Sequence, residues 1–149
     1  MEPDSQSVTE YLHSHIPITA QMGVRAVTAD ELLVRLEAPL EPNLNHQWTA
    51  FGGSIASIGV LACWCLVQVR LHVRGIDAQL VIRNSTIDFI RPALGPFQGT
   101  AVAPAEDTWE HLVDMLQRKG RGRIELCSEV TCAGKTVAGH RGVYVARIV

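Results

Sequence analysis

The sequence is short of aromatic residues, of net charge and of cysteine, and each shortage argues against a class of protein. Aromatic residues make up 5% of the 149 residues while hydrophobic residues make up 47%, so we expect an aliphatic core. A formal net charge of −2 argues against a nucleic-acid-binding protein, which is usually basic. Four cysteines do not amount to the disulfide framework of a small secreted protein.

The cysteines do not form a metal site either. Cys63 and Cys65 lie two residues apart in an apolar run, and on a helix this spacing directs them to different faces. We therefore expect buried, reduced thiols at both positions and at Cys127 and Cys132, and no metal. The N-terminal residues lack the basic and apolar regions of a signal peptide, so we expect a soluble, cytoplasmic protein.

Charge is absent from Gly52 to Val69, a run of 18 residues. A run of this length raises the question of a membrane span. It contains glycine, serine and glutamine, however, and lies between strand-like segments, so a central helix enclosed by a sheet explains it better. The run also has no Asp or Glu, so this helix supplies no carboxylate base.

Hydrophobic periodicity predicts one domain, residues 1–149, that begins with a helical segment over 1–16. The predicted helices are 7–15, the long central helix 51–72, and 108–117. The predicted strands are 23–27, 32–38, 79–90, 97–103, 123–131 and 137–148. Alternation along 79–90 predicts one face with Leu80, Ile82, Asn84 and Thr86 and the other with Ser85 and Phe89. The fold class is therefore α+β, with an antiparallel sheet of five or six strands wrapped around one long helix.

The start of the central helix carries the main candidate site. Gly52 and Gly53 let a ligand approach the backbone closely, and their free N–H groups face whatever binds there. Asn45, on the preceding loop, offers two side-chain N–H donors. Converging donors suit a carbonyl oxygen that becomes negative during a reaction. The alternative is that Asn45 caps its own loop with local hydrogen bonds.

Neighbouring residues have both a structural and a functional interpretation. Asn43 fits a loop-structural role or a substrate contact, Thr49 a loop bond or a substrate contact, and Ser54 a helix start. A nucleophilic role for Ser54 would need a base. The candidate bases are His46, which fits a solvated loop residue better, and Asp88, which fits a surface carboxylate better.

Four basic residues lie within six positions at Arg118, Lys119, Arg121 and Arg123. One interpretation is a solvated turn. The other is a landing site for CoA phosphates or for an acidic carrier protein, where charge mainly raises the association rate.

The order of these elements, with Asn45 ahead of Gly-Gly at the start of a buried helix, resembles the hot-dog fold. The PaaI-like branch of hot-dog thioesterases has an N-x5-H-G-G signature and a helix carboxylate about nine residues after the His. Here Phe51 takes the His position, and Ile58 to Leu61 occupy the region of the carboxylate. The hydrolytic groups of that branch are therefore absent.

A more extensive resemblance is to the thioesterase domain in the C-terminal half of YiiD-type proteins. The matching residues are Ile16-Pro17-Ile18-Thr19, Met22-Gly23, Ala38-Pro39-Leu40, Asn43-Leu44-Asn45, Thr49, Phe51-Gly52-Gly53-Ser54, Arg91-Pro92 and Arg118-Lys119-Gly120-Arg121. Members of that family act as malonyl-ACP decarboxylases, either fused behind an acetyltransferase domain or alone, and the length of this chain resembles the stand-alone form.

The resemblance implies roles for the candidate residues. Asn45 and Gly53 would be catalytic, and the substrate-binding residues would be Asn43, Thr49, Phe51, Gly52, Ser54, Arg118, Lys119 and Arg121. No cofactor is implied beyond the CoA or phosphopantetheine arm of the substrate, and we expect a homodimer or a tetramer built from it. Hydrolysis of acyl-CoA or acyl-ACP is the alternative activity, and a non-catalytic acyl-binding or dimerisation module is a further one.

Overall fold

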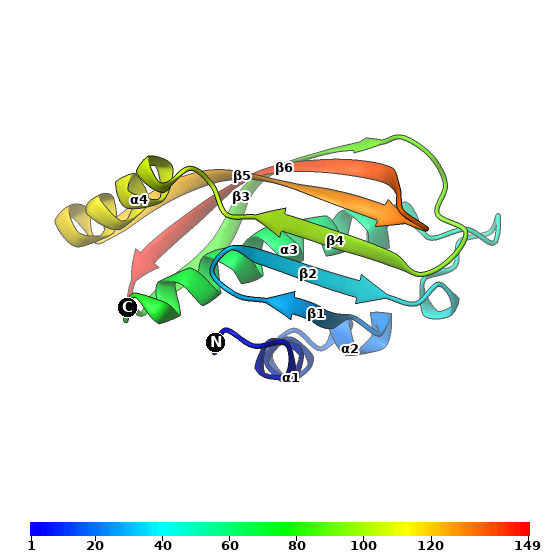
Figure 1. Ribbon diagram of the computed structural model, residues 1–149, viewed down its shortest axis with the longest axis horizontal. Coiled ribbons are helices and arrows are strands. Elements are labelled where there is room, and N and C mark those ends of the chain that lie inside the picture. Colours follow the sequence, from blue (N-terminus) through cyan, green and yellow to red (C-terminus); the bar gives the residue numbers. More distant parts are fainter.

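The computed structural model describes residues 1–149 as a curved sheet wrapped around one helix (Figure 1). Two short helices, α1 (Ser5–His15) and α2 (Ile18–Met22), come first. The sheet contains β1 (Arg25–Ala29), β2 (Leu33–Ala38), β3 (Ala78–Phe89), β4 (Phe97–Val102), β5 (Arg121–Cys132) and β6 (Lys135–Ile148). The short turn η1 (Glu41–Asn43) and the long helix α3 (Gly52–Val73) lie between β2 and β3, and α4 (Glu106–Lys119) lies between β4 and β5.

The strand order is β1-β2-β4-β5-β6-β3, and every neighbouring pair is antiparallel. Helix α3 lies along the inner face of the sheet and contacts β2, β3, β4, β5 and β6 (Figure 1). The predicted α+β architecture, with six strands and one central helix, is confirmed. The sequence analysis missed α2 and η1, which are too short to show a periodicity.

Helix α3 has the length and composition of a membrane span, but 61% of its apolar window is buried inside the domain. Its close fit to the sheet is clearest at Gly99 of β4, where a Cβ atom would lie 2.7 Å from the Ile58 carbonyl oxygen. Only glycine allows the strand and the helix to approach this closely. This burial is typical of the core helix of a soluble domain.

Strand β3 differs from the predicted alternation. Its register with β6 shifts between Ile82 and Asn84, so Arg83 is an extra residue in a bulge. Ile82 pairs with the buried Tyr144, whereas Asn84 pairs with Val143 on the opposite face. Asn84 and Thr86 therefore lie on the outer face, and the prediction that they share a face with Leu80 and Ile82 was wrong.

The thiols also differ in part from expectation. All four cysteines are free, and Cys63 and Cys65 are fully buried as predicted, but Cys127 is exposed and Cys132 is partly buried. Strand β5 alternates strictly between buried and exposed residues, and Cys127 occupies an exposed position.

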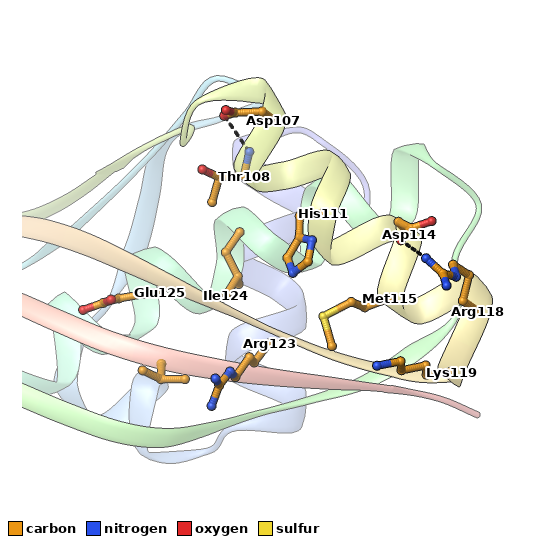
Figure 2. A pocket seen from close by; sticks show the side chains of 11 residues that line it. Asp107, Thr108, His111, Asp114, Met115, Arg118, Lys119, Arg123, Ile124 and Glu125 are labelled. Carbon is orange, nitrogen blue, oxygen red and sulfur yellow. Dashed lines mark hydrogen bonds and ion pairs between the residues drawn. The ribbon is translucent and has the colours of Figure 1, made fainter.

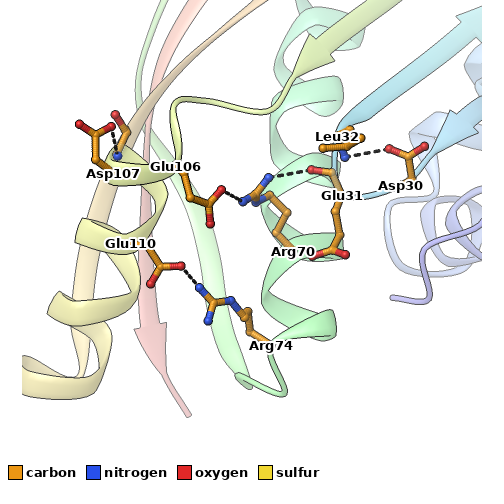
Figure 3. Close-up of polar contacts among 9 residues, drawn as sticks. Asp30, Glu31, Leu32, Arg70, Arg74, Glu106, Asp107 and Glu110 are labelled. Atoms are coloured by element: carbon orange, nitrogen blue, oxygen red, sulfur yellow. Dashed lines mark hydrogen bonds and ion pairs between the residues drawn. The ribbon is translucent and has the colours of Figure 1, made fainter.

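Helix α4 is held against the C-terminal end of α3 by a buried arginine (Figure 3). Arg70 donates from Nη1 to the Glu31 carbonyl oxygen at 2.8 Å and from Nη2 to the Glu106 carboxylate at 3.2 Å. Its guanidinium also lies over the buried Trp109 ring, 4.6 Å from the ring centre. Arg70 thus ties the turn between β1 and β2, the end of α3 and the start of α4 together.

Candidate functional site

Helix α3 begins without a capping side chain. The cap position is Phe51, which makes no side-chain cap bond, and the first backbone N–H of the helix with an acceptor is that of Ser54, bonded to the Phe51 carbonyl at 3.0 Å. The N–H groups of Gly52 and Gly53 have no acceptor. A helix N-terminus with unpaired donors favours a negatively charged oxygen.

Two phenyl rings flank these glycines. A Cβ atom at Gly53 would lie 2.3 Å from the Phe51 ring, so a larger residue there would require this ring to move. A Cβ atom at Gly52 would lie 3.5 Å from the ring of Phe89, the last residue of β3. The glycines therefore lie between two phenyl rings, and both rings are exposed to solvent in the single protomer.

Asn45 organises the loop that precedes α3. Its Oδ1 accepts from the N–H groups of Gln47, at 2.9 Å, and Thr49, at 3.2 Å. Its Nδ2 donates to Thr49 Oγ1 at 2.9 Å and to the Ala50 carbonyl at 3.4 Å. These four bonds are all local, and they fit the interpretation in which Asn45 caps its own loop. The last bond is long and therefore weak.

Asn43 has a structural role in the same loop. Its side chain is 3% exposed and donates to the carbonyls of Met22, at 2.9 Å, and Pro39, at 2.7 Å. Its own carbonyl accepts from the Phe51 N–H at 2.7 Å, which positions the start of α3. A cavity of about 390 Å³ lies beside Asn43 and the buried Ser54, between α2 and the first turns of α3.

Neither predicted base reaches this site. His46 is exposed at the tip of the loop beside Trp48, which is 76% exposed. Asp88 pairs with Gly139 and lines a shallow hollow with Cys127 and Arg141 on the outer face of the sheet. The candidate site consequently has hydrogen-bond donors and no adjacent acid or base.

The basic residues lie at the other end of the molecule. Arg118 and Lys119 end α4 and, with Arg123 of β5, line a groove of about 940 Å³ that also contains Asp107, Asp114 and Glu125 (Figure 2). Arg118 forms an exposed ion pair with Asp114 at 3.3 Å. Arg121 is exposed at the start of β5 but does not line the groove.

Arg70, on the far end of α3 from Gly53, contacts the start of α4, and Arg118 and Lys119 lie at the opposite end of α4. Arg70 and Gly53 are 17 residues apart on one helix, about 25 Å at a rise of about 1.5 Å per residue. Within one protomer, the structure does not bring the basic residues to the glycines.

Sequence reasoning missed a polar cluster inside the domain. His140 of β6 is 3% exposed and contacts Tyr144 and Ser85, and its burial lowers its pKa. The same burial raises the pKa of the Cys63 thiol to about 11 and also raises the pKa of Tyr144. Alternation along 137–148 is a signal that places His140 and Tyr144 on the same buried face, but the contact with Ser85 of β3 cannot be read from the sequence.

Comparison with known proteins identifies the family. The family model described as "Putative thioesterase (yiiD_Cterm)" matches residues 5–148. The protein OLEI01261 from Chlorobaculum tepidum, of unknown function, is similar at 28% identity with a TM-score of 0.92, over 97% of this chain and 94% of that one. A protein from Shewanella oneidensis, described as "the putative thioesterase", is similar at 25% identity and a TM-score of 0.86, over 95% of this chain and 96% of that one.

A more distant structure shows the same fold. The PaaI protein of the E. coli phenylacetic acid degradation operon is 21% identical with a TM-score of 0.68, over 97% of this chain and 96% of that one. With a family match that spans nearly all residues and relatives that share the sheet around α3, this hot-dog protein belongs to the family described as "Putative thioesterase (yiiD_Cterm)".

Proposed function

We propose that this protein decarboxylates a malonyl thioester, carried on acyl carrier protein or CoA, to the acetyl thioester. The bond between the substrate carboxylate and its α-carbon breaks, carbon dioxide leaves, and the electron pair forms an enolate with the thioester carbonyl. The Gly53 N–H and the weakly bonded amide N–H of Asn45 would hold the enolate oxygen. Water would then protonate the α-carbon. One such donor typically contributes about 100- to 1,000-fold in rate.

The observation that carries this proposal is the presence of unpaired donors without an adjacent base. Decarboxylation needs a stabilised enolate oxygen and an apolar surrounding for the departing carboxylate, and no group that removes a proton. The rings of Phe51 and Phe89 supply the apolar surrounding. The buried Asn43 and the half-buried Thr49 hold the loop, while Gly52 and Ser54 open the helix beside the thioester.

We further propose that the working unit is a homodimer joined through β3. This strand is at the edge of the sheet, is 12 residues long and exposes Val81, Phe89 and the adjoining Ile90. Long exposed edges with apolar side chains are rare in monomers because they pair with other strands. A homodimer is the smallest assembly that would cover this edge.

The dimer would also bring opposite ends of the two copies together. Antiparallel pairing of β3 with its copy about a two-fold axis places the Ala78 end of one strand beside the Phe89 end of the other. The Ala78 end adjoins the start of β5, through Ile148 of β6. The second copy's basic residues would then share an end with this copy's Gly53, where they would attract the phosphates of CoA or an acidic carrier protein.

Hydrolysis of acyl-CoA or acyl-ACP is the second candidate. The description of the family and of the Shewanella oneidensis relative favours it. Hydrolysis needs a base that activates water, which contributes about 100- to 10,000-fold in rate. A non-catalytic acyl-binding module is the third candidate. A cytoplasmic location belongs to the same proposal and is supported by the four free cysteines.

Product analysis separates the three candidates. The protein would be incubated with malonyl-ACP, acetyl-ACP and longer acyl-ACP, and the carrier would be examined by intact mass. Conversion of malonyl-ACP to acetyl-ACP is the expected result. Release of free acid together with free carrier thiol as the main products would favour the hydrolase, and no conversion of any of them would favour the binding module.

A further inference from the structure

The part of β5 from Arg121 to Cys127 has an open edge. Strand β4, its neighbour on the side away from β6, pairs with β5 only as far as Ala101, which lies opposite Ser128. Beyond this point β5 has β6 on one side and no strand on the other. The open edge faces away from β6 and β3, so the pairing of β3 with its copy proposed above leaves it uncovered.

The sequence explains why β4 stops here. The Ala103 N–H donates to the Leu32 carbonyl at 2.8 Å, so Ala103 is directed at β2, and alternation would direct Pro104 at β5. The register of β4 and β5, continued by three residues, would place Pro104 opposite Glu125. Proline has no N–H to donate, so the ladder does not continue, and the chain turns into α4 at Glu106 instead.

Backbone groups of β5 point to the open side. The Ile148 N–H donates to the Gly120 carbonyl at 2.8 Å, so by alternation the even-numbered residues at the start of β5 bond to β6. The N–H and C=O groups of Arg123 and Glu125 therefore point away from β6, where β4 no longer pairs. These donors and acceptors are free to bond an added strand.

Helix α4 lies along the open edge and leaves a groove beside it (Figure 2). The groove has a volume of about 940 Å³, and a second hollow of about 460 Å³ shares Glu125 with it and extends to Cys127 and Pro104. Met115 of α4 and Ile124 of β5 are apolar residues in the lining of the groove. An extended chain in this groove would bond to the β5 backbone and direct alternate side chains towards α4.

The groove has unpaired cations at one end. Arg118 is offset by Asp114 at 3.3 Å, whereas Lys119 and Arg123 take part in no ion pair. Both lie where α4 ends and β5 begins, and both are exposed. A lysine and an arginine that converge on the end of a groove suit a carboxylate.

The opposite end of the groove is acidic. It carries Asp107, in the first turn of α4, and Glu125, which has only an exposed contact with Arg141 at 3.6 Å. A strand added antiparallel to β5, as β4 is, would run from this end towards Arg123. Its N-terminal side would meet the acidic residues and its C-terminal side the basic ones, so the charges favour this direction of the added chain.

We propose that this groove binds the extended C-terminal segment of a partner protein. The segment adds a strand to β5 and places its terminal carboxylate between Lys119 and Arg123. Alternate residues of the segment are apolar, because they face Met115 and Ile124. The open edge has room for about six residues of an added strand. Lys119 and Arg123 also belong to the basic residues that would attract the substrate, but this binding is measured directly and does not depend on the decarboxylation.

The test is calorimetric titration of the full-length protein with a hexapeptide of alternating valine and threonine that has an N-terminal lysine and a free carboxyl terminus. We expect saturable binding. Amidation of the carboxyl terminus should weaken it by about 10-fold or more, the usual result of losing a charge-assisted hydrogen bond. Methylation of the peptide nitrogens that face β5 should abolish binding, whereas methylation of the alternate nitrogens should leave most of it.

Charge reversal at two neighbouring positions of β5 gives a matched pair of variants. Arg123→Glu should weaken binding of the peptide by about 10-fold or more. Arg121→Glu changes the same charge on the same face of β5 but outside the groove, so it should change binding by less than about two-fold. Thermal unfolding checks that both variants fold.

Four results would overturn the proposal. They are the absence of saturable binding up to about 1 mM peptide, equal weakening by the two variants, equal effects of the two methylation patterns, and binding of desulfo-CoA in the groove without any binding of the peptide. The last result would assign the groove to the nucleotide of CoA.

Discussion

Replacing Asn45 by Asp separates the proposed catalytic role of its amide from its structural role. Asp keeps an oxygen that can accept from the Gln47 and Thr49 N–H groups, so the two bonds to Oδ1 persist. It loses both Nδ2 donor bonds, including the long one to the Ala50 carbonyl. It also places a negative charge beside the proposed enolate oxygen. The variant therefore removes the oxyanion donor while largely retaining the loop.

The two substitutions at Asn45 should differ in stability, and Asn45→Asp should reduce activity at least as much as Asn45→Ala. Either should lower kcat by about 100- to 1,000-fold, the usual effect of losing one oxyanion donor. Asn45→Ala loses all four side-chain bonds of a partly exposed loop. At a net of about 0.5–1.5 kcal/mol for a typical bond, less where water replaces it, the loss is about 2 kcal/mol. In a domain of this size that lowers Tm by about 4–8 °C, whereas Asn45→Asp should lose less than half as much.

The assay combines malonyl-ACP turnover, followed by mass, with thermal unfolding of the same samples. Turnover is expressed per folded molecule, so that a loss of stability is not counted as a loss of catalysis. Near-normal kcat in folded Asn45→Asp would refute the oxyanion role and leave Asn45 as a loop-capping residue. His46→Ala is the companion variant, because its severe loss of activity would indicate that His46 activates water and favour hydrolysis.

Three further outcomes follow from the structure. Gly53→Ala should lower kcat on the order of 100-fold, because the Phe51 ring must move from a position 2.3 Å from the new Cβ; steady-state kinetics measures this. Charge reversal at Arg118 and Lys119 should raise KM and flatten its salt dependence, since exposed charges are screened. Burial lowers the pKa of His140 in the folded chain, so below about pH 6.5 the unfolded chain binds a proton more readily and the free energy of unfolding falls. His140→Gln should lessen this fall, which chemical denaturation at several pH values measures.

Each of these changes has a matched control. Gly52→Ala adds a Cβ in ordinary contact with the Phe89 ring, 3.5 Å away, and should be mild. Lys135→Glu reverses an exposed charge at the start of β6 and should leave the salt profile of KM unchanged. His111→Gln changes an exposed histidine and should leave the acid loss of stability in place. A control that behaves like its partner variant would contradict the corresponding reasoning.

The central helix and the order of the strands could be predicted because their signals are local. The uncharged run ends near Arg70, and the helix extends to Val73, one residue beyond the predicted end. Strands β5 and β6 alternate between buried and exposed residues over most of their length, as the sequence pattern predicts. Element ends shifted by at most two residues, as helix and strand ends generally do.

What could not be predicted depends on contacts between distant segments. The bulge at Arg83 reverses the faces of β3, and only its pairing with β6 reveals it. The same shift places Ser85 on the face that meets His140. The separation of Arg118 from Gly53 follows from the strand order and from the direction of α3. In the sequence, each residue is recognisable only as a position near the end of a helix.

The donors at the start of α3 have no adjacent base, and the products test this arrangement directly. A substrate bound there would be stabilised as an enolate and would keep its thioester bond. Folded Asn45→Asp should therefore slow the formation of acetyl-ACP without releasing free acid. Free acid as the main product of the unmodified protein would show that a group elsewhere activates water, and would contradict the reasoning from the missing base.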